Sequence, residues 1–201
     1  MKKILVIVGM QNDLVTGPAS FEGAASVVEP IRKKMENGSW DTVRFVSDCH
    51  ATKERYYQTA EAGVFPPHCI DGDDGMKIVP ELAECKWLSD RDPFYKDSPG
   101  RFIGPVLEHD VDGSVWDSWT NRGAEYEIHV VGIRASSSVI AMAANLRTEF
   151  PCAKIVLDAE CVADESDEKL RAAILVAKSI FCEIENEGNK NENQNEKKDN
   201  D

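Results

Sequence analysis

Basic residues are scarce in this chain. It carries 23 lysines and arginines against 36 acidic residues, a formal net charge of -13 at pH 7. Nucleic acids and anionic membrane surfaces are bound by clustered positive charge, so neither is an expected partner. Long apolar runs are missing too, since no stretch approaches the roughly 20 residues of a membrane-spanning helix.

Targeting and disulfide signals are also missing. Only five aliphatic residues separate Lys3 from Gly9, which is shorter than the apolar region of a secretion signal. The six cysteines form no Cys-x-x-Cys pair and are too sparse for a disulfide-stapled secreted domain. We therefore expect reduced thiols and a cytoplasmic protein.

What the sequence does have is an alternation of short β-branched runs with helical patterns. This alternation is typical of βαβ units, whose strands form a parallel sheet, and it predicts an α/β fold. Strands are expected at residues 3–8, 42–47, 127–131, 154–158 and 180–183, with a weaker candidate at 86–89. Helices are expected at residues 24–36, 137–148 and 166–177.

Length and composition indicate a single folded unit. A chain of 201 residues with 42% hydrophobic residues can bury one sizeable core. We assign residues 1–184 to that domain. Residues 185–201 contain no apolar side chain, and such a segment cannot bury enough surface to fold, so we expect a disordered acidic and Asn-rich tail.

Three polar segments follow predicted strands, where ligands bind in parallel α/β sheets. The first runs from Gly9 to Asp13 and reads Gly-Met-Gln-Asn-Asp. The second combines Asp48-Cys-His50 with Glu54 and with the Pro-His-Cys that contains His68. The third runs from Gly132 through Arg134 and a triple serine that ends at Ser138.

Together these segments resemble the isochorismatase and nicotinamidase type of cysteine hydrolase. The family has Asp-x-Gln-Asn-Asp after the first strand, Asp-x-His and Pro-His-Cys in its metal-binding segment, and Val-x-Gly-x-x-Thr-Asp-x-Cys at its nucleophile. The resemblance implies a three-layer α-β-α sandwich with a six-stranded, mainly parallel, Rossmann-like sheet. It also implies hydrolysis of small amides and assembly into homo-oligomers.

The catalytic positions depart from this pattern. Gly9 stands where the family has the acid that takes the thiol proton, and Ser138 stands where it has the nucleophilic cysteine. The family lysine falls on Asp90 or, after a one-residue shift, on Arg91. A serine hydroxyl depends on an adjacent base, which Gly9 cannot supply. We therefore expect an inactive or strongly impaired enzyme, in which Ser138 satisfies amides at a helix N-terminus and Asp13 bonds turn amides.

The metal-binding segment retains more of the pattern. The resemblance makes Asp48, His50 and His68 candidate ligands, and Glu54 stands where nicotinamidases have another histidine. Imidazole and carboxylate ligands suit Zn, Mn or Fe. In the alternative interpretation, Asp48 and His50 cap the following turn and Glu54 is a solvated helix residue.

Residues beside the former nucleophile complete the candidate site. Ile133 and Arg134 lie where the substrate or an oxyanion would bind, and Arg134 replaces a small residue of the family. We expect Arg134 to anchor an anionic small molecule or to form a surface ion pair. Two other functions stay open. One is a hydrolase that uses a metal at Asp48, His50 and His68, and the other is a structural subunit that pairs through loops near Trp116 and Trp119.

Overall fold

The computed structural model describes residues 1–84, 94–96 and 123–187. Its centre is one six-stranded sheet with the order β3-β2-β1-β4-β5-β6, and every pair of neighbouring strands is parallel. The strands are β1 (Lys2–Val8), β2 (Thr42–Asp48), β3 (Phe94–Lys96), β4 (Tyr126–Ile133), β5 (Lys154–Ala163) and β6 (Glu183–Glu185). The predicted α/β class with a parallel sheet is confirmed.

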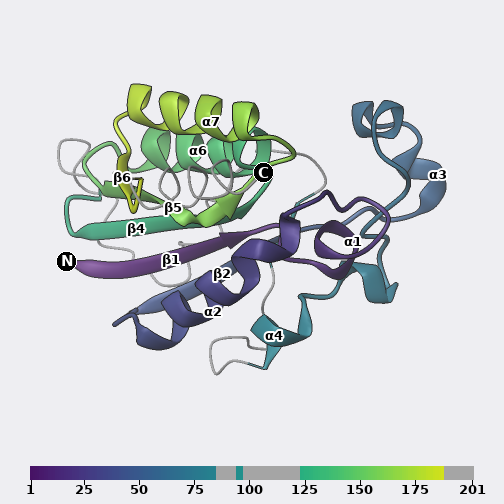
Figure 1. The fold of residues 1–201 in the computed structure, drawn as a ribbon, viewed down its shortest axis with the longest axis horizontal. Coiled ribbons are helices and arrows are strands. Elements are labelled where there is room, and N and C mark those ends of the chain that lie inside the picture. The colour runs from purple at the N-terminus through teal and green to yellow at the C-terminus, as the bar shows by residue number, and fades with distance from the viewer. Residues whose placement is uncertain (85–93, 97–122, 188–201) are drawn as a thin grey trace, which may run out of the picture.

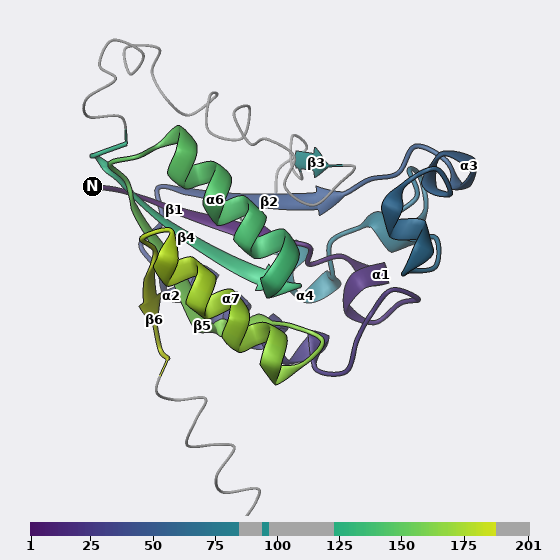
Figure 2. The same cartoon turned by 90° about the horizontal axis from the view of Figure 1, so that it is seen from above.

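Helices cover both faces of this sheet and make it a three-layer sandwich (Figure 1). One face carries the 3-10 turn η1 (Ala24–Val27) with α2 (Val28–Asn37) and α4 (Pro80–Ala83), and the other carries α6 (Ile140–Glu149) and α7 (Asp167–Ser179). The view from above shows α6 and α7 lying side by side along the strands (Figure 2). Among the described residues, no helix combines the length and apolar character that a membrane crossing requires.

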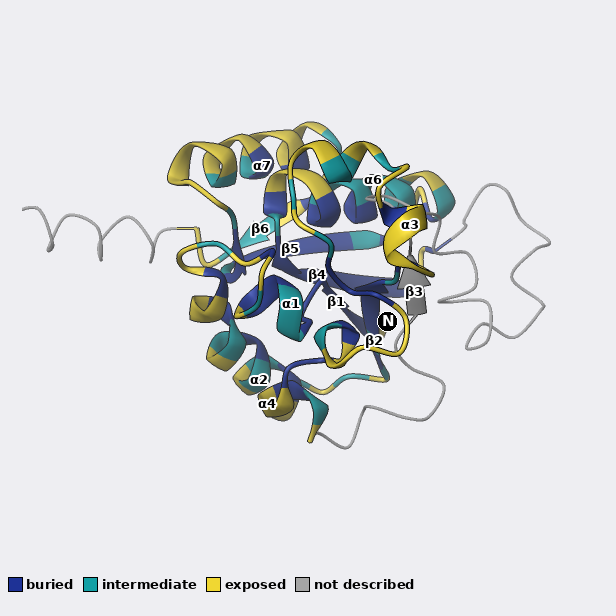
Figure 3. Ribbon diagram, turned by 90° about the vertical axis from the view of Figure 1, so that its right-hand side faces the viewer, coloured by how far each residue is buried: buried dark blue, intermediate teal, exposed yellow. Residues whose placement is uncertain are grey.

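Each face of the sheet has its own hydrophobic core because side chains alternate along a strand. In β1, Leu5 and Ile7 pack in the cluster under α2, while Val6 and Val8 pack in the cluster under α6 and α7. The central strand β4 is buried along all eight residues. Buried strands therefore lie between helices that expose only their outer faces (Figure 3), as in parallel sheets generally.

The last predicted strand was misplaced. Residues 180–183 were expected to form it, but Ile180 follows α7 directly and β6 begins at Glu183. The intervening residues close the helix, since Cys182 N donates to Ala177 O at 2.9 Å and Phe181 adopts a φ of 63°. A left-handed residue with such back-bonding is a common helix C-terminus. Glu185, placed in the tail by the sequence, belongs to β6.

The edge of the sheet beside β2 lies partly outside the described residues. The weaker strand candidate at residues 86–89 falls outside the described residues, and the strand that pairs with β2 is β3, at Phe94–Lys96. Residues 188–201 of the predicted tail also lie outside them.

Short elements gather beyond the carboxyl ends of the strands. They are α1 (Asn12–Val15), α3 (Lys53–Tyr56), and the 3-10 turns η2 (Ala60–Gly63) and η3 (Asp74–Met76).

Candidate functional site

The site lies where the strand order reverses. Strand β1 pairs with β2 on one side and with β4 on the other, so the chain segments that leave these three strands meet at one edge. A topological switch of this kind is the usual ligand site of a parallel α/β sheet. The three polar segments found in the sequence follow these strands.

Gln11 joins two of these segments. Its fully buried side chain donates from Nε2 to the carbonyls of Asp48 and Met76, at 2.8 Å each, and its Oε1 accepts from Asp48 N at 2.6 Å. Asp13 makes a second link, because its Oδ2 accepts from Cys69 N at 2.8 Å. A bond to a backbone amide is the role expected for Asp13. The first segment therefore holds the second in place.

Gly9 lies among aliphatic side chains just after β1. Its φ is 71°, and a Cβ built on it would lie 3.4 Å from Ile133 Cγ1 and 3.6 Å from Leu14 Cδ1. Ile133 is buried at the end of β4, and Gly9 is not among the residues that line the cavity described below. A short side chain at position 9 would therefore start among aliphatic groups.

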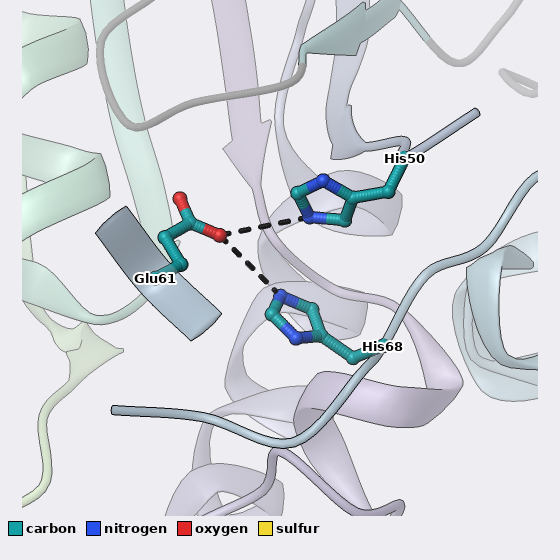
Figure 4. A group of neighbouring side chains, drawn as sticks. All are labelled: His50, Glu61 and His68. Atoms are coloured by element: carbon teal, nitrogen blue, oxygen red, sulfur yellow. Dashed lines mark ion pairs between the residues drawn. The ribbon is translucent and has the colours of Figure 1, made fainter. Parts of the chain in front are cut away.

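Three side chains of the second segment converge on one point (Figure 4). The ligand atoms that His50, Glu61 and His68 offer all lie within 4.8 Å of one another. Glu61 Oε2 is 3.6 Å from His50 Nε2 and 3.8 Å from His68 Nε2. Both histidines are buried, and each packs edge-on against Tyr56. Two imidazoles and one carboxylate are a suitable ligand set for a first-row transition metal.

The geometry of this group fits such an ion. Ligand atoms about 2.1 Å from a tetrahedral zinc lie about 3.4 Å apart, close to the two separations from Glu61. Nδ1 of His68 lies 2.9 Å from the carbonyl of Pro66. With the proton assigned to Nδ1, the Nε2 lone pair faces the group, as in metal sites whose histidines are oriented by a second hydrogen bond.

Glu61, and not Glu54, completes this group. Glu54 lies on α3 with its side chain in solvent, where hydrogen bonds from its own amide and from Thr52 lower the pKa of its carboxyl. Asp48 stays outside the compact group but lines the adjoining cavity. The structure thus brings together His50 and His68 and adds a residue that the sequence argument missed. One signal was present, because Glu61 is the single acid between Glu54 and His68.

The third segment forms a tight turn above the same cavity. A π-helical turn, η5 (Ala135–Val139), leads into α6 and carries all three serines. Ser138 is only 5% exposed, and Ser136 N donates to Asp164 Oδ2 at 2.5 Å. The cavity measures about 210 Å³. Its described lining residues are Asp48, Glu61, Phe65, His68, Arg134, Ser136, Ser137, Ser138, Asp164, Glu165 and Lys169.

Arg134 is held by the protein itself. Its guanidinium forms an ion pair with Glu165, donates to Ala19 O at 2.6 Å and lies 4.0 Å from the ring centre of Phe65. A hydrogen bond from Lys169 and the charge of Arg134 lower the pKa of Glu165 against the opposing effect of burial. Of the two roles expected for Arg134, the structure shows the ion pair, in a partly buried form.

The remaining predicted positions lie outside the described residues. These are Asp90 and Arg91, the two candidates for the family lysine, and the tryptophans Trp116 and Trp119. Their roles stay predictions.

Comparisons with known proteins agree on the fold. No family model matches the chain. No curated protein matches it either. Among solved structures, a nicotinamidase from Bacillus subtilis superposes with a TM-score of 0.69 at 22% identity, over 92% of this chain and 99% of that one. An isochorismatase-like hydrolase from Alkaliphilus metalliredigens gives 0.68 at 18% identity, over 92% and 94%. A pyrazinamidase of Pyrococcus horikoshii in complex with zinc gives 0.62 at 17% identity, over 92% and 98%. The chain therefore has the fold of isochorismatase-like hydrolases and nicotinamidases.

Proposed function

We propose that this chain is an isochorismatase-like protein that has lost the cysteine hydrolase reaction, and that it binds a divalent cation and a small molecule in the cavity beside Ser138. The observation that carries the proposal is the chemistry of two positions. Gly9 cannot accept a proton, and the cavity presents the Ser138 hydroxyl where a thiol would be needed. A fold alone does not establish an activity, so the loss of the reaction is inferred from these residues.

No described cysteine takes the place of a nucleophile in the cavity. The described residues that line the cavity include no cysteine. Burial raises the pKa of Cys161 to about 12 and also raises that of Cys182. Because the thiolate is the reactive form, neither thiol is activated. These facts support the loss of the thiol route.

The charge of the cavity supports a bound cation. Its described lining has four carboxylates, from Asp48, Glu61, Asp164 and Glu165, against two cations, Arg134 and Lys169. The formal charge of these six side chains is -2, which one divalent ion would balance. His50, Glu61 and His68 would hold Zn, Mn or Fe. When bound, such an ion supplies Lewis acidity and lowers the pKa of a coordinated water.

The partner expected from the resemblance is a second copy of the chain, and it remains a proposal. With a net charge of -13, the chain is not expected to bind nucleic acid or anionic membranes. A small polar molecule is the ligand that a cavity of about 210 Å³ favours.

Metal content and activity together test the proposal. We expect protein purified without chelator to bind close to one Zn²⁺ or Mn²⁺ per chain and to melt at a higher temperature with the metal, since a ligand that binds only the folded state stabilises it. Glu61→Ala should weaken binding at least tenfold. Metal-loaded protein should hydrolyse nicotinamide far more slowly than about 1 per second, a low rate for an enzyme.

Glu54→Ala is the matched control, because it removes a carboxylate from the same segment but not from the converging group. It should leave metal affinity unchanged. Equal losses in the two variants, or a metal-free protein that gains no thermal stability with either ion, would contradict the metal site. Nicotinamide turnover at ordinary enzymatic rates would contradict the loss of hydrolysis.

A further inference from the structure

Arg134 occupies a position that is unfavourable for an arginine. It directly precedes η5, the turn that carries the three serines, and its φ of 55° and ψ of 57° lie in the left-handed region. Side chains other than glycine, asparagine and aspartate rarely adopt this conformation. An arginine at such a position requires a reason in its contacts.

Those contacts fix the guanidinium over one wall of the cavity. Its centre lies 4.0 Å from the ring centre of Phe65, which is the stacking distance of a cation–π pair. Glu165 and the carbonyl of Ala19 hold the guanidinium from other directions, and the side chain is only 11% exposed. Arg134 and Phe65 both line the cavity.

We propose that Arg134 is a specificity-determining plug, which covers the ring of Phe65 and closes the cavity to flat aromatic ligands. The proposal rests on the proposed function, in that the cavity is taken to bind a small molecule. Apart from His68, Phe65 is the one aromatic side chain among the described lining residues. A planar ligand would stack there, and the planar guanidinium already occupies that face. The native ligand is therefore compact and non-aromatic.

The anchors explain why the plug stays in place. Arginine presents its donors in a rigid fork, and here the fork is used by the Glu165 carboxylate and the Ala19 carbonyl. Glu165 is itself paired with Lys169, four residues further along the chain. An incoming ring would have to break these bonds before it could replace the guanidinium over Phe65.

Arg134→Asn tests the plug, with nicotinamide as a planar probe. Asparagine tolerates the left-handed backbone and is too short to reach Phe65. We expect the variant to bind nicotinamide at least tenfold more tightly than the wild type, measured by calorimetry or by ligand-observed NMR. Adding Phe65→Ala should abolish that gain. Arg171→Asn is the matched control, because it makes the same replacement at an exposed arginine of α7 that does not line the cavity, and it should leave the affinity unchanged.

Several outcomes would overturn the inference. They are a wild type that binds the probe as tightly as Arg134→Asn, a gain that survives Phe65→Ala, and an equal gain in Arg171→Asn, which would indicate an effect of net charge. If Arg134→Asn does not fold, Glu165→Gln is the second test, because it requires no change of backbone conformation. It loosens the anchor and should raise probe affinity about threefold, and no change there would also overturn the plug. Measurements with and without added Zn²⁺ separate this result from the metal proposal, because the plug does not depend on the ion.

Discussion

A carboxylate at position 9 would extend from a strained backbone into aliphatic surroundings. Gly9 has a positive φ, and its Cβ direction leads to Ile133 and Leu14 rather than to the cavity. Its amide donates to Val46 O at 2.9 Å and its carbonyl accepts from Gln11 N at 2.9 Å. These bonds hold the backbone of Gly9 at a positive φ, which glycine adopts without strain.

Restoring the acid should therefore not restore the reaction. We expect Gly9→Asp, alone or with Ser138→Cys, to lower the free energy of unfolding by about 2 kcal/mol, because backbone strain and a carboxylate beside aliphatic groups both oppose it. Urea denaturation measures the loss. Gly9→Ala provides the control, as it adds the strain without the charge and should cost less. Nicotinamide hydrolysis by the double variant would show that the carboxylate reaches the nucleophile after all.

The candidate site was partly predictable from residue spacing. Three residues chosen from the sequence, Asp48, His68 and Ser138, line one cavity, and His50 lies beside His68. Asp48, His50 and Ser138 lie at or just after the ends of β2 and β4, which spacing predicts well. Glu61 was not predictable in this way. It reaches the histidines because α3 and η2 fold the segment back on itself, and that path depends on tertiary packing.

At the scale of elements, long periodic segments were predicted well and short ones poorly. Strands β1, β2, β4 and β5 begin within one residue of their predicted starts, because β-branched runs between turns define them. Strand β4 continues to Ile133 and β5 to Ala163, beyond the predicted ends. The error at β6 has a specific cause, since Ile180 and Cys182 look like strand residues in sequence but pack as the end of α7.

The junction of β1, β2 and η3 depends on one side chain. Gln11 bonds three backbone groups of Asp48 and Met76 in a fully buried position. We expect Gln11→Met, which conserves length, to lower the free energy of unfolding by about 3 kcal/mol, because buried groups that lose their partners cost about 1–3 kcal/mol each. It should also weaken metal binding, since Asp48 leads directly to His50. Thermal melting and metal titration measure the two effects.

Asn12→Ala is the comparison for that variant. Asn12 Nδ2 makes one exposed bond, to Asp74 O at 2.9 Å, so its removal should cost no more than about 1 kcal/mol. An equal loss in the two variants would mean that the Gln11 bonds are not what holds the junction.

At the scale of the whole molecule, a partly buried charge network connects β6 to the rest of the fold. Lys34 on α2 reaches Asp158 on β5 at 2.6 Å and Glu185 on β6 at 3.1 Å. On β4, His129 Nε2 lies 2.8 Å from Glu127 Oε1, and His129 Nδ1 lies 3.5 Å from Glu185 Oε2. The network thus joins a helix to three strands on the α2 side of the sheet.

This network predicts how stability depends on pH. Burial lowers the pKa of His129, outweighing the opposite effect of its bond to Glu127. Burial alone would raise the pKa of Asp158, but bonds from Lys34 and Asn186 bring it below the usual value. The bond from His129 lowers the pKa of Glu127. In each case the unfolded chain takes up the proton first as the pH falls, so acid destabilises the fold.

We therefore expect the free energy of unfolding to fall in two phases as the pH is lowered. The first begins near pH 6.5, the ordinary pKa of histidine, and the second near pH 4, the ordinary range of carboxyls. Urea denaturation at a series of pH values measures both. His129→Gln should remove the first phase and keep the second. A first phase that persists in His129→Gln would assign the titration to another group.

Lys34→Met should lower the free energy of unfolding by about 3 kcal/mol near neutral pH, because it leaves the buried Asp158 carboxylate without its cation. A Lys34→Met variant as stable as the wild type would mean that β6 is held by its backbone pairing alone.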